Sequence, residues 1–387
     1  MAASCSTTGS NRPHLANVSE PWLPLAGIQV VDFSMFVPGP FASSILADLG
    51  ADVIKVEPPR GDPGRSYVPV QFNTENRNKR SIALDLKQAD AARVVARLVE
   101  KAQVVIEGFR PGVVKRLGID YERLRGHNPA LVYCSISGYG QTGPWRERPG
   151  HDVNYVAAAG GLAFPGQWRK PPTRSSLPIA DMAGGAFAAL AILAAVREGK
   201  GAYLDMSLFE AAFFLCAMRH GLDADVDPRA HLFPVNDVFE TADGKRLTLG
   251  ILEEHFWQNF VRLAPELADE RFASDEKRRA HGDELSRRLE AVIRGRPAAE
   301  WLRLLEEHDV PVDLCVTPAE AATHPQLVER QAAERGFAKF PVWANGRRGG
   351  AISRGTPELG EHSREVLVEL GFDEGDIAEL RRKGVVR

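Results

Sequence analysis

The sequence predicts a doubly wound α/β fold for the first half of the chain, followed by a smaller α+β domain. Two observations lead to this prediction. Short runs rich in β-branched residues alternate with segments whose apolar residues recur every three or four positions, which is typical of a parallel sheet covered by helices. In the second half, helical patterns rich in Arg and Glu accompany two hairpin signals instead.

Five apolar runs are expected to form strands of one sheet, at residues 27–33, 52–56, 81–86, 102–106 and 131–136. Between them, segments 41–49 and 90–101 carry the apolar stripe that a helix presents to a sheet. The longest apolar stretch, 183–196, falls short of a bilayer span and predicts a buried core helix. A sixth strand is expected at 202–207, with a helix over 208–220.

The pattern of apolar and polar residues changes after this helix. A hairpin over 238–249 turns on Asp243-Gly244, helical segments continue to about residue 308, and a second hairpin is expected at Asn345-Gly346. The expected organisation is a disordered arm at 1–20, a large domain at 21–221, a linker at 222–236, a small domain at 237–325, and a return segment at 326–387 that packs on the large domain.

Composition narrows the partners and the compartment. The 387 residues carry 48 basic and 51 acidic side chains, a net charge of -3, which predicts neither a nucleic-acid partner nor a membrane partner. The four cysteines are widely spaced, which predicts neither a metal site nor a disulfide framework. The first twenty residues contain no apolar run, so no secretory signal is expected. Together these features favour a cytoplasmic protein.

One motif is a false lead. Residues 138–143 match G-x-G-x-x-G after a strand, but Pro144 and Pro149 keep the following segment irregular. A dinucleotide site needs a helix there to hold the pyrophosphate. We therefore reject a nicotinamide or flavin site.

Two carboxylate-bearing segments are the candidates for chemistry. The run G-H-D-V-N-Y at 150–155 places His151 and Asp152 where an irregular loop enters a helix. Asp181 stands at the start of the longest apolar helix, where desolvation raises a carboxyl pKa and the helix dipole opposes that shift. The alternative is structural: Asp152 and Asp181 cap their helices and His151 is a hydrogen-bonded structural histidine.

A basic run, residues 77–80, precedes the third strand and is a candidate for binding several phosphate charges of one ligand. Its alternative is a solvated run of charges. The segment at 37–40 lies between the first strand and its helix, where a helix N-terminus receives polar or anionic groups.

Several ordered motifs resemble the family III CoA-transferases nearly from end to end. They are P-G-P-F-A at 38–42, A-D-L-G-A-D-V-I-K-V-E at 47–57, L-D-L-K at 84–87, R-P-G at 110–112 and S-G-Y-G at 137–140. The resemblance implies a Rossmann-like large domain, a smaller domain, an interlocked homodimer and an acyl-CoA substrate. It implies no tightly bound cofactor, with coenzyme A entering as part of the substrate, and no metal.

Within that superfamily, residues 150–155 resemble the motif of the α-methylacyl-CoA racemases. The resemblance implies that His151 and Asp181 are the two acid/base residues, at the racemase interval of 30 residues, and that Glu253 partners the histidine. The backbone N–H of Asp152 is the candidate donor to the enolate oxygen. Asp181 also matches the nucleophilic aspartate of the transferases, so it does not separate the two branches.

The resemblance further implies which residues contact coenzyme A. In the large domain they are Leu84, Asp85, Leu86, Lys87, Gly108, Phe109, Arg116 and Leu117, and near the histidine they are Gly150, Asn154 and Tyr155. The chain departs from the family at Pro58, where relatives often place an arginine near the phosphates. That contact is expected to be lost or moved to Lys55, Arg60 or the 77–80 run, and the departure favours the transferases slightly.

Three functions remain open on these residues. The first is epimerisation of a 2-methylacyl-CoA, in which His151 and Asp181 flank a planar enolate and exchange its α-proton. The second is CoA transfer between carboxylic acids through an Asp181 acyl anhydride. The third is CoA binding without catalysis. We favour the first, because a histidine is superfluous to the transfer and necessary to the two-base scheme.

Overall fold

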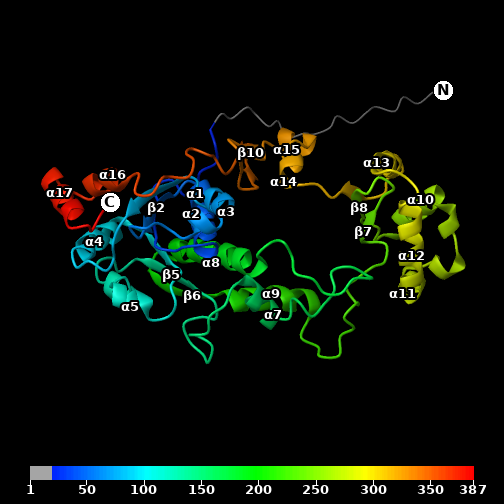
Figure 1. Cartoon of the computed structure of the whole chain (residues 1–387), viewed down its shortest axis with the longest axis horizontal. Helices are drawn as coiled ribbons and strands as arrows, with labels where there is room; N and C mark the ends of the chain where they lie inside the picture. The colour runs from blue at the N-terminus through cyan, green and yellow to red at the C-terminus, as the bar shows by residue number, and fades with distance from the viewer. Residues whose placement is uncertain (1–19) are drawn as a thin grey trace, which may run out of the picture. The chain divides into compact units, whose positions relative to one another are not determined.

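The chain forms two compact units in a computed structural model that describes residues 20–387 (Figure 1). The first unit comprises residues up to Pro149, then Asp181–Leu208 and Pro325–Arg387, and the second comprises Gly150–Ala180 and Phe209–His324. The expected arm at 1–20 lies outside the described residues except for its last position.

A parallel sheet of six strands forms the centre of the first unit, in the order β3-β2-β1-β4-β5-β6. Its strands are β1 Gln29–Asp32, β2 Asp52–Glu57, β3 Lys79–Ala83, β4 Val104–Glu107, β5 Val132–Ser137 and β6 Ala202–Ser207. All six expected strands are present, so the predicted doubly wound α/β class is confirmed. Because β1 pairs with both β2 and β4, the order of the strands reverses at this point.

Helices cover both faces of this sheet. The helices of the first unit are α1 Pro38–Asp48, α2 Gly64–Tyr67, α3 Pro69–Glu75, α4 Ala91–Lys101, α5 Val113–Leu117, α6 Tyr121–Leu124, α8 Ile179–Glu198, α15 Pro325–Glu329, α16 Ser363–Glu369 and α17 Glu374–Arg382. Two short ribbons, β10 Ala333–Glu334 with β11 Phe337–Ala338 and β12 Trp343–Ala344 with β13 Arg347–Arg348, precede α16. The second ribbon is the hairpin expected at Asn345-Gly346.

The core of the first unit follows from the alternation of side chains along β1. Val31 and Phe33 lie in one buried cluster with residues of α4, α16 and α17, which Figure 1 shows side by side. Successive side chains of a strand point to opposite faces, so Asp32 points to the other face, which α1 covers. The C-terminal helices α16 and α17 therefore complete the core on one face.

The apolar helix α8 is, among residues 20–387, the one helix long and apolar enough to cross a membrane by length and composition. Its glycines instead suit close packing inside the unit. A Cβ at Gly184 would lie 2.3 Å from Cδ2 of Leu208, and one at Gly185 would lie 2.6 Å from the carbonyl oxygen of Pro38. Only glycine permits this approach, which presses the start of α8 against the start of α1.

The second unit contains a three-stranded antiparallel sheet in the order β7-β8-β9. The strands of this sheet are β7 Val238–Glu240, β8 Arg246–Leu249 and β9 Val312–Leu314. The helices of the second unit are α7 Asp152–Ala158, α9 Leu208–His220, α10 Glu254–Leu263, α11 Asp275–Ala280, α12 Gly282–Ile293, α13 Ala298–Glu307 and α14 Pro318–Ala321. Two 3₁₀ turns lie at Pro265–Leu267 and Glu270–Phe272. The expected hairpin at Asp243-Gly244 joins β7 to β8. Residues 138–150 contain no helix, in agreement with the rejection of a dinucleotide site.

The two units do not coincide with the expected domain boundaries. Residues 150–180 and 209–221, expected in the large domain, are grouped with the second unit, and so is the expected linker. Specific contacts explain the grouping. Phe164 stacks on His220 with ring centroids 3.9 Å apart, and the indole N–H of Trp168 donates to Asp283 at 2.9 Å. The pattern of residues along the sequence does not show that these segments pack with the second unit.

Buried charges hold the loop between β1 and α1. Asp32, Lys55 and Lys79 are all fully buried. The carboxylate of Asp32 accepts from the ammonium group of Lys79 at 3.2 Å and from the hydroxyl groups of Ser34 and Ser43. Burial alone raises the pKa of Asp32, but Lys79, Lys55 and the two serines outweigh it and lower the pKa, so the carboxylate stays ionised.

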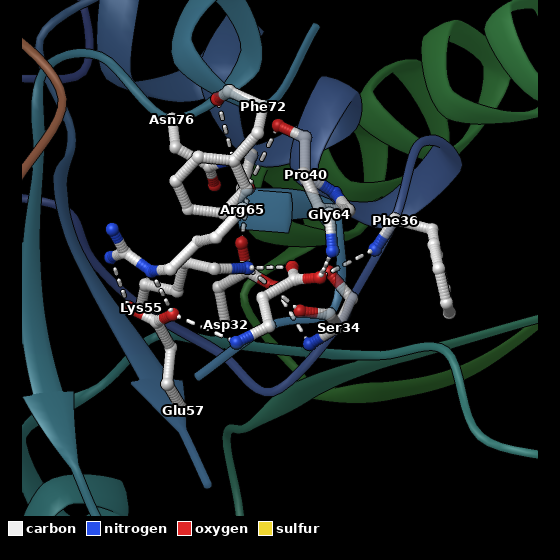
Figure 2. Close-up of polar contacts among 12 residues, drawn as sticks. Asp32, Ser34, Phe36, Pro40, Lys55, Glu57, Gly64, Arg65, Phe72 and Asn76 are labelled. Carbon is white, nitrogen blue, oxygen red and sulfur yellow. Dashed lines mark hydrogen bonds and ion pairs between the residues drawn. The ribbon is translucent and has the colours of Figure 1, made fainter. Parts of the chain in front are cut away.

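A second set of contacts, made by Lys55 and Arg65, lies around the loop between β1 and α1 (Figure 2). Lys55 donates to the carbonyl oxygen of Ser34 at 2.9 Å and pairs with Asp62 at 3.0 Å. Arg65 makes two hydrogen bonds of 2.8 Å to Glu57 and covers the ring of Phe72, with its guanidinium carbon 4.4 Å from the ring centroid. The charges therefore satisfy one another inside the protein.

Replacing Lys79 by Met tests the importance of this network. The substitution leaves Asp32 with one buried cation fewer, and removing one partner of a buried pair costs about 3–5 kcal/mol. We expect that loss in the free energy of unfolding measured by urea denaturation. Lys200→Met, at a side chain that is 77% exposed, is the control and should change stability by no more than about 0.5 kcal/mol. Equal stability of the two variants would contradict the role of the network.

Candidate functional site

The candidate site of the first unit starts where the strand order reverses, at the carboxyl ends of β1 and β4. Open α/β sheets bind ligands at this position. Ser34 follows β1 and Gly108 follows β4, and a Cβ at Gly108 would lie 3.5 Å from Cβ of Ser34. The two loops therefore lie in contact at the point of reversal.

Residues expected to contact coenzyme A gather around one core cluster. Leu84 is buried within it, and Leu86, Phe109 and Leu117 are partly buried against it. Three more of the expected residues are exposed, namely Lys87, Gly108 and Arg116. The segments after β3, after β4 and in α5 therefore pack against the same apolar cluster. The cationic side chains of Lys87 and Arg116 remain exposed to solvent.

Asp85 shapes the turn that presents Lys87. Its carboxylate accepts from the backbone N–H of Lys87 at 3.1 Å, and its own N–H donates to the carbonyl oxygen of Val385 at 2.8 Å. The extreme C-terminal segment therefore supports this turn. Asp85 has a structural reason to be acidic, whatever its ligand contacts.

The expected phosphate-binding run does not offer free cations. Arg77 pairs with Asp48, Arg80 pairs with Asp52 at 2.5 Å as well as with two glutamates of α16, and Lys79 is part of the buried network. Neither a phosphate site nor a solvated run of charges describes these residues. Pattern alone misses this, because internal and solvent-exposed cations look the same in a sequence.

His151 occupies the N-cap position of α7, in the second unit, and is exposed. Its backbone N–H donates to the side-chain oxygen of Asn154 at 3.0 Å, and the phenol of Tyr155 donates to the carbonyl oxygen of Gly150 at 2.6 Å. Both neighbours, expected at the cofactor, thus also fix the backbone on either side of the histidine. The imidazole is presented from a well-defined turn.

Asp152 is buried, with 6% of its surface exposed. One carboxylate oxygen accepts a hydrogen bond of 2.7 Å from the backbone N–H of Ala180, in the first turn of α8. Asp152 follows His151 in the chain and Ala180 precedes Asp181. This hydrogen bond therefore ties the residue that follows one candidate residue to the backbone that precedes the other.

Asp181 lies in the first turn of α8 and is half-buried. It precedes Gly185 by four residues, so both lie on the same face of the helix, the face that Gly185 presses against Pro38. Glu253 is exposed at the N-cap position of α10 in the second unit. Because Asp181 belongs to the first unit, the meeting of His151, Asp181 and Glu253 in one site stays a prediction.

Two buried glutamates of the first unit were not expected from the sequence. Glu107 ends β4, is 1% exposed, and accepts from the N–H of Phe109 at 2.7 Å. Burial raises its pKa to about 7. Glu75 ends α3 and is 6% exposed. For Glu107 a signal was present, because a carboxylate directly ends an apolar strand before two residues expected at coenzyme A.

The comparisons with known proteins agree with this architecture. The CoA-transferase family III pattern matches residues 25–363. An acetyl-CoA:oxalate CoA-transferase of Acetobacter aceti is 37% identical over 81% of this chain and 86% of that protein. The alpha-methylacyl-CoA racemase of Homo sapiens is 30% identical over 94% of this chain and 97% of that protein.

Solved structures lead to the same conclusion. The crystal structure of a CAIB/BAIF family protein from Brucella suis matches with a TM-score of 0.81 at 31% identity, over 90% of this chain and 99% of that chain. The fold, the ordered motifs and the overall matches all support one assignment, and the resemblance noted from the sequence is confirmed. The chain belongs to family III of the CoA-transferases.

Proposed function

We propose that the protein epimerises a 2-methylacyl-CoA by moving the α-proton between two bases, His151 and Asp181. The observation that carries this proposal is the hydrogen bond between Asp152 and Ala180, since it links the backbones that flank the two bases. An exposed imidazole on a fixed turn supports it further. A transferase has no need of that histidine.

The chemistry starts from the acidity that the thioester carbonyl confers on the α-hydrogen. One base removes this proton from one face and leaves a planar enolate, and the other, already protonated, delivers a proton to the opposite face. The imidazole of His151 and the carboxyl group of Asp181 take these two roles in either order, according to the configuration of the substrate. Glu253 orients the imidazole, as carboxylates do for other catalytic histidines.

CoA transfer is the second candidate, and the identity of 37% to an acetyl-CoA:oxalate CoA-transferase favours it. In this scheme a carboxylate oxygen of Asp181 attacks the thioester carbonyl, the C–S bond breaks, and a mixed anhydride forms while the CoA thiolate leaves. A second carboxylate then takes over the activated group by reversal of these steps. His151 has no role in it.

Coenzyme A is proposed to lie along the loops after β3 and β4. Since Lys55, Arg77 and Arg80 are engaged inside the protein, the phosphate contact displaced by Pro58 falls to exposed cations. Arg60, Lys87 and Arg116 are exposed and fit this role. Gly108, Phe109 and Leu117 supply the neighbouring surface.

A second copy of the chain is the proposed partner. Helix α9 exposes four large apolar side chains, with exposed fractions of 45% at Phe213, 54% at Phe214, 38% at Leu215 and 73% at Met218. Large apolar side chains exposed together on one helix are typical of a protein interface. It supports the interlocked homodimer that the family resemblance implies. A cytoplasmic location stays a prediction.

Substitution of His151 by Ala tests the two-base scheme. Incubation of a 2-methylacyl-CoA with the wild-type enzyme in heavy water is expected to introduce deuterium at the α-carbon, which mass spectrometry detects. His151→Ala should lower this rate about 10²–10⁴-fold, the usual contribution of a general acid or base. His127→Ala, at another exposed histidine, is the control. An inert α-hydrogen together with CoA moving to added acids would select the transferase.

Asp152→Ala tests the link between the two helices. The variant removes the acceptor for the N–H of Ala180 and is expected to lose about 0.5–2 kcal/mol of stability in urea denaturation, as for other helix-capping residues. Asp152→Asn retains an acceptor oxygen and should lose less. Exchange should decline in the alanine variant even where it is fully folded. Full exchange activity in folded Asp152→Ala would remove this hydrogen bond from the mechanism.

Lys87→Ala tests the proposed phosphate contact. Loss of a hydrogen bond to a charged group is worth about 1.5–3 kcal/mol, so Kd for free coenzyme A should rise about tenfold to hundredfold in isothermal titration calorimetry. Lys200→Ala is a matched control at an exposed lysine. Identical affinities of the two variants would show that the phosphates bind elsewhere.

A further inference from the structure

Glu107 is a buried acid whose carboxyl group is bonded to the loop after β4. It is the last residue of β4 and is 1% exposed. One of its oxygens accepts from the backbone N–H of Phe109 at 2.7 Å. The other accepts from the hydroxyl group of Ser135, which lies opposite Glu107 on β5. The carboxyl group therefore holds the backbone two residues beyond the end of its own strand.

Ser135 and its neighbours hold the carboxyl group in place. Ser135 is itself 1% exposed, and its oxygen also accepts from the side-chain amide of Gln141 at 2.8 Å. The backbone N–H of Gln141 in turn donates to the carboxylate of Asp205, on β6, at 3.0 Å. A continuous set of hydrogen bonds thus joins β6, the loop after β5 and Glu107. The direction of the Glu107 side chain is therefore set by the two strands beside it.

The loop after β4 is also packed closely against the loop after β1. A Cβ at Gly108 would lie 3.5 Å from Cβ of Ser34, so the two loops are in contact just before Phe109. A hydrogen-bonded turn at 110–113 then leads into α5, which carries the exposed Arg116. The N–H of Phe109 is thus held at the point from which the chain turns toward α5.

We propose that Glu107 is a positioning residue for coenzyme A, which sets the backbone of the loop after β4 so that Phe109 and Arg116 reach the same ligand. The proposal rests on the proposed function, since it assumes that coenzyme A lies along this loop. Glu107 is 1% exposed and acts through Phe109 rather than by contact with the ligand. It takes no proton from the substrate.

A carboxyl group serves this purpose in both protonation states. Burial raises the pKa of Glu107 to about 7, while the hydrogen bonds from Ser135 and Phe109 oppose that shift and the charge of Asp205 adds to it. As a carboxylate, the group accepts with both oxygens. As a neutral acid, it still accepts from Phe109 with one oxygen and donates to Ser135 with the other. Glutamine offers the same pair of groups as the neutral acid, and leucine offers neither.

Isothermal titration calorimetry with free coenzyme A tests this role without turnover. Glu107→Leu leaves the buried N–H of Phe109 without its acceptor and should raise Kd about tenfold. Glu107→Gln should bind nearly as well as the wild type. Ser135→Ala removes a partner of the carboxyl group, should also raise Kd, and serves where Glu107→Leu does not fold. Glu75→Leu is the control, because this buried glutamate is bonded to Gln71 within its own helix.

Two results of the titration would overturn the role of Glu107. The first is an equal Kd for the wild type and for the folded Glu107→Leu and Ser135→Ala variants. The second is a Glu107→Gln variant that binds as weakly as the leucine variant, because the acceptor for Phe109 would then not be what matters. Wild-type protein that binds no coenzyme A would overturn both this role and the proposed function.

The kinetics of α-hydrogen exchange separate positioning from chemistry. Glu107→Leu should raise KM for the acyl-CoA about tenfold and change kcat little, because only the binding loop is altered. A lower kcat at unchanged KM would place Glu107 in the chemistry and refute the positioning role. Coenzyme A binding that depends on Glu107, in a protein without α-exchange, would refute the epimerisation and support the role of Glu107.

Discussion

Asp32, buried between Lys55 and Lys79, is the interaction on which the carboxyl edge of the sheet depends. Moving a carboxylate and two ammonium groups out of water costs several kcal/mol for each ion, and only complete pairing offsets that loss. The partners of Asp32 come from the two strands β2 and β3, from the loop after β1 and from α1. Because all of them have to be in place together, the loop at 33–37 and the first turn of α1 adopt one arrangement.

That first turn in turn positions the candidate residue of the first unit. The glycines of α8 allow its backbone to reach Pro38, and a side chain at Gly185 would prevent this approach. Asp181 is placed as a consequence, one turn earlier on the same face. The hydrogen bond from Ala180 to Asp152 adds a second constraint on the same turn of α8. Close backbone packing at the start of α8 therefore fixes the position of this carboxyl group.

The family assignment leaves the choice of reaction to a few residues. A carboxylate such as that of Asp181 can act as a base or as a nucleophile, so its presence does not distinguish epimerisation from CoA transfer. His151 is the group that distinguishes the two reactions, because the two-base scheme needs it and the transfer does not. A nucleophilic carboxylate works best without a proton, whereas a general acid needs one. The protonation of Asp181 is thus the property that separates the two chemistries.

Much of the fold and part of the site follow from local pattern. The strands, the principal helices and both hairpins are local features, because alternation and turn residues act over a few positions. The family motifs likewise place Lys87, Phe109 and Asp181 along the chain. The sequence pattern did not predict which charged side chains are buried and paired inside the protein. The 77–80 run reads like a ligand-binding patch, and in the structure its side chains pair internally.

The sequence by itself therefore determined the class of the fold, the order of its strands along the chain and the family of the protein. Only the tertiary structure decided that Lys55 and Lys79 are buried, that Asp152 accepts from the N–H of Ala180, and that burial raises the pKa of Glu75. The physical reason is that charge, burial and pKa depend on neighbours from distant parts of the chain, while secondary structure depends mainly on neighbours in sequence.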